Sequence, residues 1–132
     1  MEYKVKVHWG DTDAAGIVFY PNFHKWMDEA THEFFSGIGH PTDTLFKENI
    51  ALPLLETHCD FKQPVVYNVE LIIQSEVVLL KEKVFKLSHQ FYCEGQLVAE
   101  GYEVRAWAST ADGRAKAVSI PEQVKNKLSL KE

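Results

Sequence analysis

The stretch from Pro21 to Gly39 reads PNFHKWMDEATHEFFSGIG, and its apolar residues recur at intervals of three and four. One face of an α-helix would carry the large apolar members of this pattern, which are Phe23, Trp26, Met27, Ala30 and Phe34. Pro21 suits a first helical turn, and Gly37 or Gly39 suits the end of a helix. The stretch therefore predicts one long amphipathic helix of about 15 residues.

The sequence on both sides of this helix has a different period, in which apolar and polar residues alternate. Residues 2–9 alternate in this way, which is typical of a strand with one face in water. The same period returns at residue 54 and predicts strands within 54–62, 67–80, 84–94, 96–108 and 115–120. Turns are predicted at Glu94-Gly95 and at Asp112-Gly113. Shorter helices are predicted over 42–49 and in the tail after Pro121.

This order of elements predicts an α+β fold with an antiparallel sheet of five or six strands, because helices do not alternate with strands. Residues 1–132 are expected to form a single domain. One long helix covers only one face of such a sheet. The other face is expected to carry the apolar residues Ile72, Val78, Tyr92, Val98 and Tyr102, and we expect a partner subunit to cover it.

Composition excludes several classes of protein. The 132 residues are 45% hydrophobic and 25% charged, which is typical of a folded globular chain. The net charge of −5 disfavours a nucleic-acid binder, and no apolar run is long enough for a membrane span. Cys59 and Cys93 have no metal-ligand spacing, so we expect two reduced, buried thiols in a cytoplasmic protein.

The loop before the long helix, residues 9–22, combines carboxylates and small residues with a helix start. A helix N-terminus presents unpaired N–H groups and partial positive charge, which together polarise a carbonyl and stabilise an oxyanion. A carboxylate in the same loop would then act as a nucleophile or as a base toward water. Taken alone, the spacing favours a plainer interpretation, in which Asp11 and Asp13 only satisfy the backbone of a turn.

Residues 10–28, GDTDAAGIVFYPNFHKWMD, closely resemble the 4-hydroxybenzoyl-CoA thioesterase family of the hotdog fold. The resemblance implies an antiparallel sheet wrapped around one long helix, assembly into a homodimer or homotetramer, and thioester hydrolysis without a metal or organic cofactor. By resemblance, Asp13 matches the catalytic aspartate and the backbone N–H of Tyr20 matches the donor that polarises the carbonyl. Asp11 is expected to organise the loop. One departure is Ala14, where the benzoyl enzyme carries proline.

The helix carries polar residues on one face, since His24, Asp28 and His32 are spaced by four. Such a face fits a ligand cleft or a subunit interface better than a metal site, because no zinc-binding motif is present. By resemblance, Asp28 is a candidate to contact the polar end of an acyl group. His24, on the same helical face, is also expected to bind substrate. Glu29 is the alternative catalytic carboxylate, as in other hotdog lineages. The histidines at 58 and 89 are expected to be structural.

A second set of candidates is basic. By resemblance, Lys81 and Lys83 match a segment that contacts the nucleotide of CoA, and Arg114 and Lys116 would join it across a subunit boundary. Glu82 stands where the family has a cation, and lysine lacks the bidentate geometry of arginine. A solvated lysine-rich turn is the competing interpretation.

We therefore expect an acyl-CoA thioesterase that favours hydroxylated aromatic acyl groups, of the 4-hydroxybenzoyl or gentisyl kind. The aromatic side chains of Phe19, Tyr20, Phe23 and Trp26 near the loop favour this acyl class. The alternatives are a short-chain aliphatic acyl-CoA thioesterase and a non-catalytic module that binds acyl-CoA or acyl-carrier protein. A hotdog dehydratase is disfavoured, because the His–Asp or His–Glu pair of the hydratase motif is missing. No nucleic-acid or membrane partner is expected.

Overall fold

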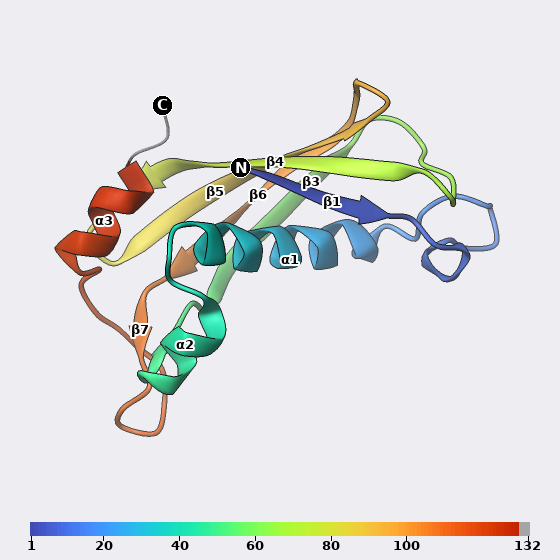
Figure 1. The fold of residues 1–132 in the computed structure, drawn as a ribbon. Coiled ribbons are helices and arrows are strands. Elements are labelled where there is room, and N and C mark those ends of the chain that lie inside the picture. The colour runs from blue at the N-terminus through green and yellow to red at the C-terminus, as the bar shows by residue number, and fades with distance from the viewer. Residues whose placement is uncertain (130–132) are drawn as a thin grey trace.

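Helix α1 (Pro21–Gly37) runs through the middle of the molecule, and a curved antiparallel sheet wraps over it (Figure 1). The computed structural model describes residues 1–129. The other elements are β1 (Glu2–Lys6), the 3-10 helix η1 (Trp9–Asp11), α2 (Thr42–Lys47), β2 (Ile50–Ala51), β3 (Leu54–Phe61), β4 (Glu70–Leu80), β5 (Val84–Cys93), β6 (Gln96–Ala106), β7 (Ala108–Ser109), β8 (Lys116–Ala117) and α3 (Glu122–Ser129).

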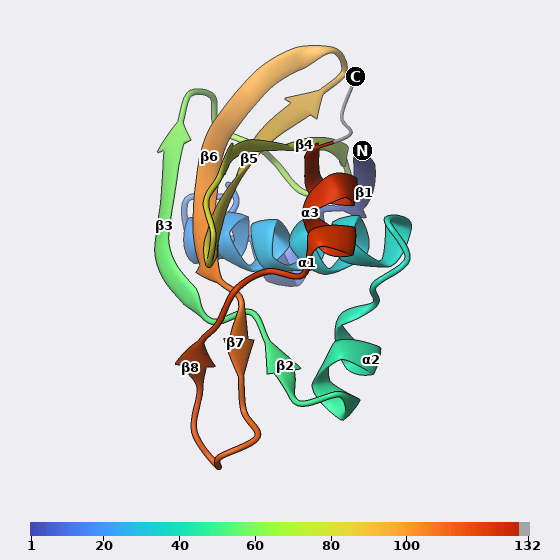
Figure 2. The ribbon, with the colours of Figure 1, turned by 90° about the vertical axis from the view of Figure 1, so that its left-hand side faces the viewer.

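The main sheet has five strands in the order β1-β4-β5-β6-β3, and every neighbouring pair is antiparallel. Strands β4, β5 and β6 are consecutive hairpin partners, whereas β1 and β3 form the two edges. Figure 2 shows the sheet curling around α1, with α2 and the β7–β8 hairpin projecting from one end. The predicted antiparallel sheet around one long helix is confirmed.

The core lies between α1 and the concave face of the sheet. The first half of α1 contributes Phe23, Trp26, Met27 and Ala30 to one apolar cluster, and the second half contributes Phe34 and Phe35 to another. Each large side chain removed from water stabilises the fold by ~1.5–3 kcal/mol. The apolar side chains that recur at helical spacing in residues 21–39 are therefore the ones that pack α1 against the sheet.

Several predicted boundaries differ from the structure. The first strand ends at Lys6 rather than at residue 9, because residues 9–11 form η1. The last predicted strand, 115–120, does not join the main sheet. Only Lys116–Ala117 of it is a strand, β8, and β8 pairs with β7 in a separate three-stranded sheet that also contains β2. The short helix after Pro41 is confirmed but ends at Lys47.

The convex face of the sheet carries most of the residues expected there. Val78 is exposed, and Ile72, Tyr92 and Tyr102 are half-buried. The prediction for Val98 was wrong, since its side chain is buried in the core beside α1. A register shift between Phe91 and Tyr92, where β5 pairs with β6, changes the alternation at this point. Whether a partner subunit covers this face stays a prediction.

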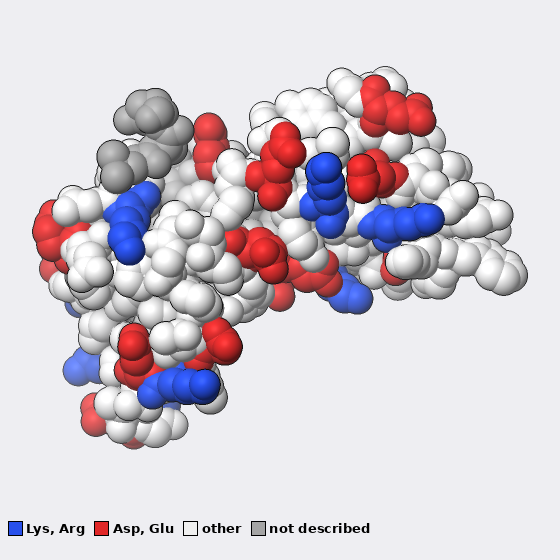
Figure 3. All heavy atoms as spheres, in the orientation of Figure 1, with Lys and Arg blue, Asp and Glu red and all other residues white. Residues whose placement is uncertain are grey.

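The thiols of Cys59 and Cys93 are free, but they are half-buried rather than buried as predicted. Burial, followed by the charge of Asp60, raises the pKa of the Cys59 thiol to about 12. No helix among residues 1–129 is long and apolar enough to cross a membrane. Basic and acidic side chains are interspersed on the face drawn in Figure 3.

Candidate active site

The loop between β1 and α1 is built by its own carboxylates. The amide of His8 donates to Asp11 Oδ2 at 2.8 Å, and the amide of Ala15 donates to Asp13 Oδ1 at 2.9 Å. Gly16 turns the chain with a φ of +82°, which glycine adopts without strain. Asp11 therefore has the loop-organising role expected of it. Among residues 1–129, no hydrogen bond to the second carboxylate oxygen of Asp13, Oδ2, is found.

A hollow of about 360 Å³ lies beside this loop and brings Asp13 and Tyr20 together. Its other lining residues come from the loop, from α1 and from the segment that ends β3; they are Ile17, Val18, Phe23, Phe61, Lys62, Gln63, Pro64 and Val65. The wall is largely apolar, with one carboxylate and one lysine facing it. The two residues that sequence analysis placed at the centre of the chemistry thus border the same cavity.

Tyr20 is the residue that caps α1, directly before Pro21 at the first helical position. The amide of Phe19 donates to the carbonyl of Asp11 at 2.9 Å, and the side chain of Asn22 donates to the same carbonyl at 2.9 Å. Within residues 1–129, no hydrogen-bond acceptor is found for the Tyr20 amide. An unpaired N–H at a helix start is a donor with the partial positive charge of the helix behind it.

Aromatic rings form the side of the hollow that faces α1. The ring of Phe61 lies 5.3 Å from that of Phe23 and 6.3 Å from that of Tyr20, measured between centroids. Sequence analysis named Phe23 and Tyr20 but missed Phe61. Phe61 is a large aromatic residue at the end of β3, which is a feature that the sequence shows. The sequence near Phe61 does not indicate, however, that this strand ends opposite the start of α1.

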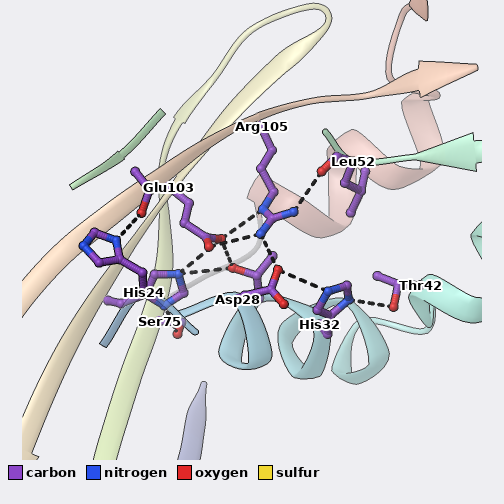
Figure 4. Close-up of polar contacts among 11 residues, drawn as sticks. His24, Asp28, His32, Thr42, Leu52, Ser75, Glu103 and Arg105 are labelled. Carbon is purple, nitrogen blue, oxygen red and sulfur yellow. Dashed lines mark hydrogen bonds and ion pairs between the residues drawn. The ribbon is translucent and has the colours of Figure 1, made fainter. Parts of the chain in front are cut away.

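The polar face of α1 does not converge on one point (Figure 4). His24 Nδ1 lies 2.8 Å from Thr57 Oγ1 on β3, while Asp28 Oδ1 accepts from Arg105 Nη2 at 2.7 Å. His32 Nε2 lies 3.3 Å from Asp28 Oδ1. Within the part of the chain that the structure describes, no group of three His, Cys, Asp or Glu side chains is arranged to hold a metal ion.

Beneath Asp28 lies a buried polar network that sequence analysis missed. Arg105 Nε and Nη2 donate to the two oxygens of Glu103 at 2.9 and 3.0 Å. The Thr31 hydroxyl also donates to Glu103, and His89 connects Thr31 to Ser75, whose hydroxyl oxygen lies 2.7 Å from His89 Nδ1. His89 is thus a satisfied core histidine, as predicted. Strand alternation predicts apolar side chains at the buried positions of β6, so it does not predict an ion pair between Glu103 and Arg105 there.

The charge of Glu103 is set by opposing effects. Burial alone would raise the pKa of this carboxyl, but the nearby His89 ring, the hydrogen bonds from Arg105 and Thr31 and the guanidinium charge outweigh it and lower the pKa to about 2. Glu103 also raises the pKa of Arg105 against the effect of burial. Both groups are therefore ionised at neutral pH.

Glu29, the alternative catalytic carboxylate, has another role in the structure. Its Oε1 accepts from the hydroxyl of Tyr3 at 2.8 Å, and it is not among the residues that line the hollow beside Asp13. Burial, followed by this hydrogen bond, raises the pKa of Tyr3 to about 12. The hydrogen bond between Glu29 and Tyr3 thus connects α1 to β1.

The four basic candidates are exposed and lie away from Asp13 within one chain. Lys81 and Lys83 occupy the turn between β4 and β5, next to α3, while the Asp13 loop lies at the opposite end of α1 (Figure 1). Arg114 and Lys116 lie on the projecting β7–β8 hairpin (Figure 2). The structure therefore does not bring these cations together with the hollow inside a single chain.

Comparison with known families supports this description of the fold. Residues 7–128 match the family model of the thioesterase-like superfamily, and the chain belongs to that family. A gentisyl-coenzyme A thioesterase of known structure is 40% identical, with a TM-score of 0.91, over 98% of this chain and 100% of the other. The predicted hotdog fold is thereby confirmed.

Two enzymes of known activity are also similar in sequence. The 4-hydroxybenzoyl-CoA thioesterase of Pseudomonas sp. (strain CBS-3) is 28% identical over 124 residues, which is 88% of each chain. The 1,4-dihydroxy-2-naphthoyl-CoA hydrolase of Synechococcus sp. (strain WH7803) is 31% identical over 121 residues, 86% of this chain and 79% of the other. All three relatives act on CoA thioesters of hydroxylated aromatic acids.

Proposed function

We propose that the protein hydrolyses acyl-CoA thioesters to a free acid and CoA, with a hydroxylated aromatic ring as the acyl group. One observation carries this proposal: the carboxylate of Asp13 and the start of α1 at Tyr20 border the same hollow. Family membership and the shared substrate chemistry of the relatives support it.

In the proposed reaction, the thioester oxygen accepts a hydrogen bond from the Tyr20 N–H. The positive end of α1 then stabilises the negative charge that develops on this oxygen during attack. Asp13 either attacks the carbonyl carbon, which forms a mixed anhydride and releases the thiolate of CoA, or removes a proton from an attacking water. In the first route, water cleaves the anhydride and restores the carboxylate. Neither route uses a metal or an organic cofactor.

The acyl class follows from the wall of the hollow. Phe23, Phe61 and Tyr20 give it an aromatic side, and its volume of about 360 Å³ suits one ring. We assign Asp28 and His24 to the polar end of the acyl group. Asp28 is half-exposed, and its carboxylate keeps acceptor capacity beyond the contacts of Oδ1 with Arg105 and His32, so it is available to a phenolic hydroxyl.

Binding of the CoA nucleotide is assigned to Lys81 and Lys83, with Arg114 and Lys116 in support. Since these residues lie far from Asp13 in one chain, the proposed site combines the Asp13 loop of one subunit with the cations of another. The protein is accordingly proposed to act as a homodimer or homotetramer. We further propose a cytoplasmic location, where CoA thioesters are formed and used.

The test is to incubate the purified protein with a panel of CoA thioesters and to measure hydrolysis from the amount of free CoA thiol that is released. We expect turnover of 4-hydroxybenzoyl-CoA and gentisyl-CoA, with a kcat/KM at least ~10-fold above that for benzoyl-CoA or butyryl-CoA, because these two lack the hydroxyl that is proposed to donate a hydrogen bond to Asp28. Preference for butyryl-CoA would favour the aliphatic alternative. Tight binding without turnover of any thioester would favour the non-catalytic module.

A further inference from the structure

Arg105 connects the polar face of α1 to the buried part of β6. Its Nη2 atom donates to Asp28 Oδ1 at 2.7 Å, and its Nε and Nη2 atoms donate to the two oxygens of Glu103 at 2.9 and 3.0 Å. Its Nη1 atom donates to the carbonyl of Leu52 at 2.8 Å. Figure 4 shows the guanidinium between β6 and α1. One cation thus holds two carboxylates that lie on different elements of the fold.

Burial increases steeply along these three charged side chains. Asp28 is 49% exposed, whereas Arg105 is 7% exposed and Glu103 is 1% exposed. The hydroxyl of Thr31, on α1, donates to Glu103 and holds this inner carboxylate from a second side. Because a planar guanidinium donates in fixed directions, a fixed Glu103 also fixes the Nη2 atom that Asp28 contacts. The position of the exposed carboxylate is therefore set from inside the core.

The contacts of Asp28 leave part of its carboxylate for a ligand. Oδ1 is contacted both by Arg105 Nη2 and by His32 Nε2, the latter at 3.3 Å. In the described part of the chain, Oδ2 of Asp28 has no hydrogen-bond donor. A carboxylate that is already held in place loses little freedom when a hydroxyl binds to it, which favours binding. Two carboxylates also share one guanidinium, and this excess of negative charge favours a ligand group that donates a hydrogen bond.

We propose that Arg105 is a positioning residue, which acts through Asp28 and sets the preference for hydroxylated acyl rings. The inference rests on the proposed function, in which Asp28 accepts the hydrogen bond of the phenolic hydroxyl. Lysine would not replace Arg105 in this role, because an ammonium has all its donors on one nitrogen and lacks the planar fork that spans Glu103 and Asp28. An acyl ring without a hydroxyl gains nothing from this arrangement.

The test is the ratio of kcat/KM for 4-hydroxybenzoyl-CoA to kcat/KM for benzoyl-CoA, which we call the acyl discrimination. Arg105→Lys keeps the buried positive charge. We expect it to lower the acyl discrimination from at least ~10 in the native protein to ~3 or less, because the hydrogen bond to Asp28 is no longer well placed. The kcat/KM for benzoyl-CoA should change less than ~2-fold. A loss of folded protein would instead lower both values equally.

Two further variants separate positioning from a general effect on structure. Asp28→Ala should abolish the acyl discrimination, and adding Arg105→Lys to Asp28→Ala should leave the ratio unchanged, because Arg105 acts only through Asp28. Tyr3→Phe is the matched control. It removes a hydrogen bond between a strand of the sheet and Glu29, the neighbour of Asp28 on α1, and should keep the native ratio.

A second route removes the cation without leaving a buried anion unpaired. In the double variant Glu103→Gln plus Arg105→Met, the glutamine oxygen still accepts from Thr31, and we expect the same loss of acyl discrimination even if Arg105→Lys fails to fold. A native ratio in either variant, or a ratio that is lost in Arg105→Lys but kept in Asp28→Ala, would overturn the inference alone. If the native protein hydrolyses neither thioester, or both equally well, the proposed function fails and the inference fails with it.

Discussion

The ion pair between Glu103 and Arg105 should dominate the acid stability of the protein. The pKa of Glu103 is lowered from 4.5 to about 2, although burial acts in the opposite direction. Since one pKa unit corresponds to ~1.4 kcal/mol, the ionised carboxylate stabilises the folded state by ~3 kcal/mol at neutral pH. Because the pKa is lower in the folded chain, this contribution is complete above pH ~4.5 and is lost as the pH falls toward 2.

Glu103→Gln tests this reasoning. The variant leaves Arg105 buried with only Asp28 as a charged partner, and we expect the free energy of unfolding at pH 7 to fall by ~3–5 kcal/mol. At pH 3 the difference from the native protein should shrink by ~2 kcal/mol, because Glu103 of the unfolded chain is then protonated while the carboxylate of the folded chain is still mainly ionised, and most of the ~3 kcal/mol is lost. Urea unfolding at the two pH values, followed by the fluorescence of the buried Trp26 and Trp107, measures both quantities.

The matched control is Glu100→Gln on the same strand. Glu100 pairs with Lys62 at 3.5 Å, and both side chains are about 40% exposed, so this change should cost less than ~1 kcal/mol at either pH. The account of the buried pair is refuted if Glu103→Gln costs no more than Glu100→Gln, or if the cost is the same at pH 3 and pH 7.

Three further changes test other parts of the structure. Replacing both Lys81 and Lys83 by alanine should raise KM for the thioester by roughly 30-fold with kcat nearly unchanged, at ~1 kcal/mol for each of the two lost phosphate contacts, and added salt should reduce the effect. Tyr3→Phe should remove one tyrosine that ionises near pH 12 from the ultraviolet titration of the protein, since burial and the hydrogen bond to Glu29 raise the pKa of this phenol. Gly101→Ala should lower the free energy of unfolding by ~3 kcal/mol in urea, because the added methyl group would overlap the backbone of β3.

Sequence periodicity predicts the long helix and the strands of the main sheet, because each of these elements depends on the spacing of apolar residues within its own segment. The apolar positions of residues 21–39 define α1, and alternation defines the strands of the main sheet. The burial of Val98 follows a register shift in the β5–β6 hairpin, which the alternation within one strand does not encode. The separation of the β7–β8 hairpin from the main sheet depends on its pairing with β2, which is distant in sequence. A register shift in one strand pair is enough to move a side chain from one face to the other.

The candidate site was predictable only in part, for the same reason. Asp13 and Tyr20 lie seven positions apart in the sequence, so their place beside one hollow follows from a loop and the helix start. The opposite wall, around Phe61, comes from the far end of an edge strand and has no signature in the loop motif. Arg105 and Glu103 are charged residues in a strand that packs against the core, where alternation predicts apolar side chains.

The kcat of Asp13→Asn tests the central claim most directly. The substitution is nearly isosteric and removes both the nucleophile and the base, so kcat for 4-hydroxybenzoyl-CoA should fall by ~10²–10⁴ with KM little changed. Glu29→Gln is the control, because the Glu29 side chain binds Tyr3 and does not line the hollow; its kcat should stay close to that of the native protein. An Asp13→Asn variant with native kcat, beside an inactive Glu29→Gln variant, would show that the helix carboxylate carries the reaction instead.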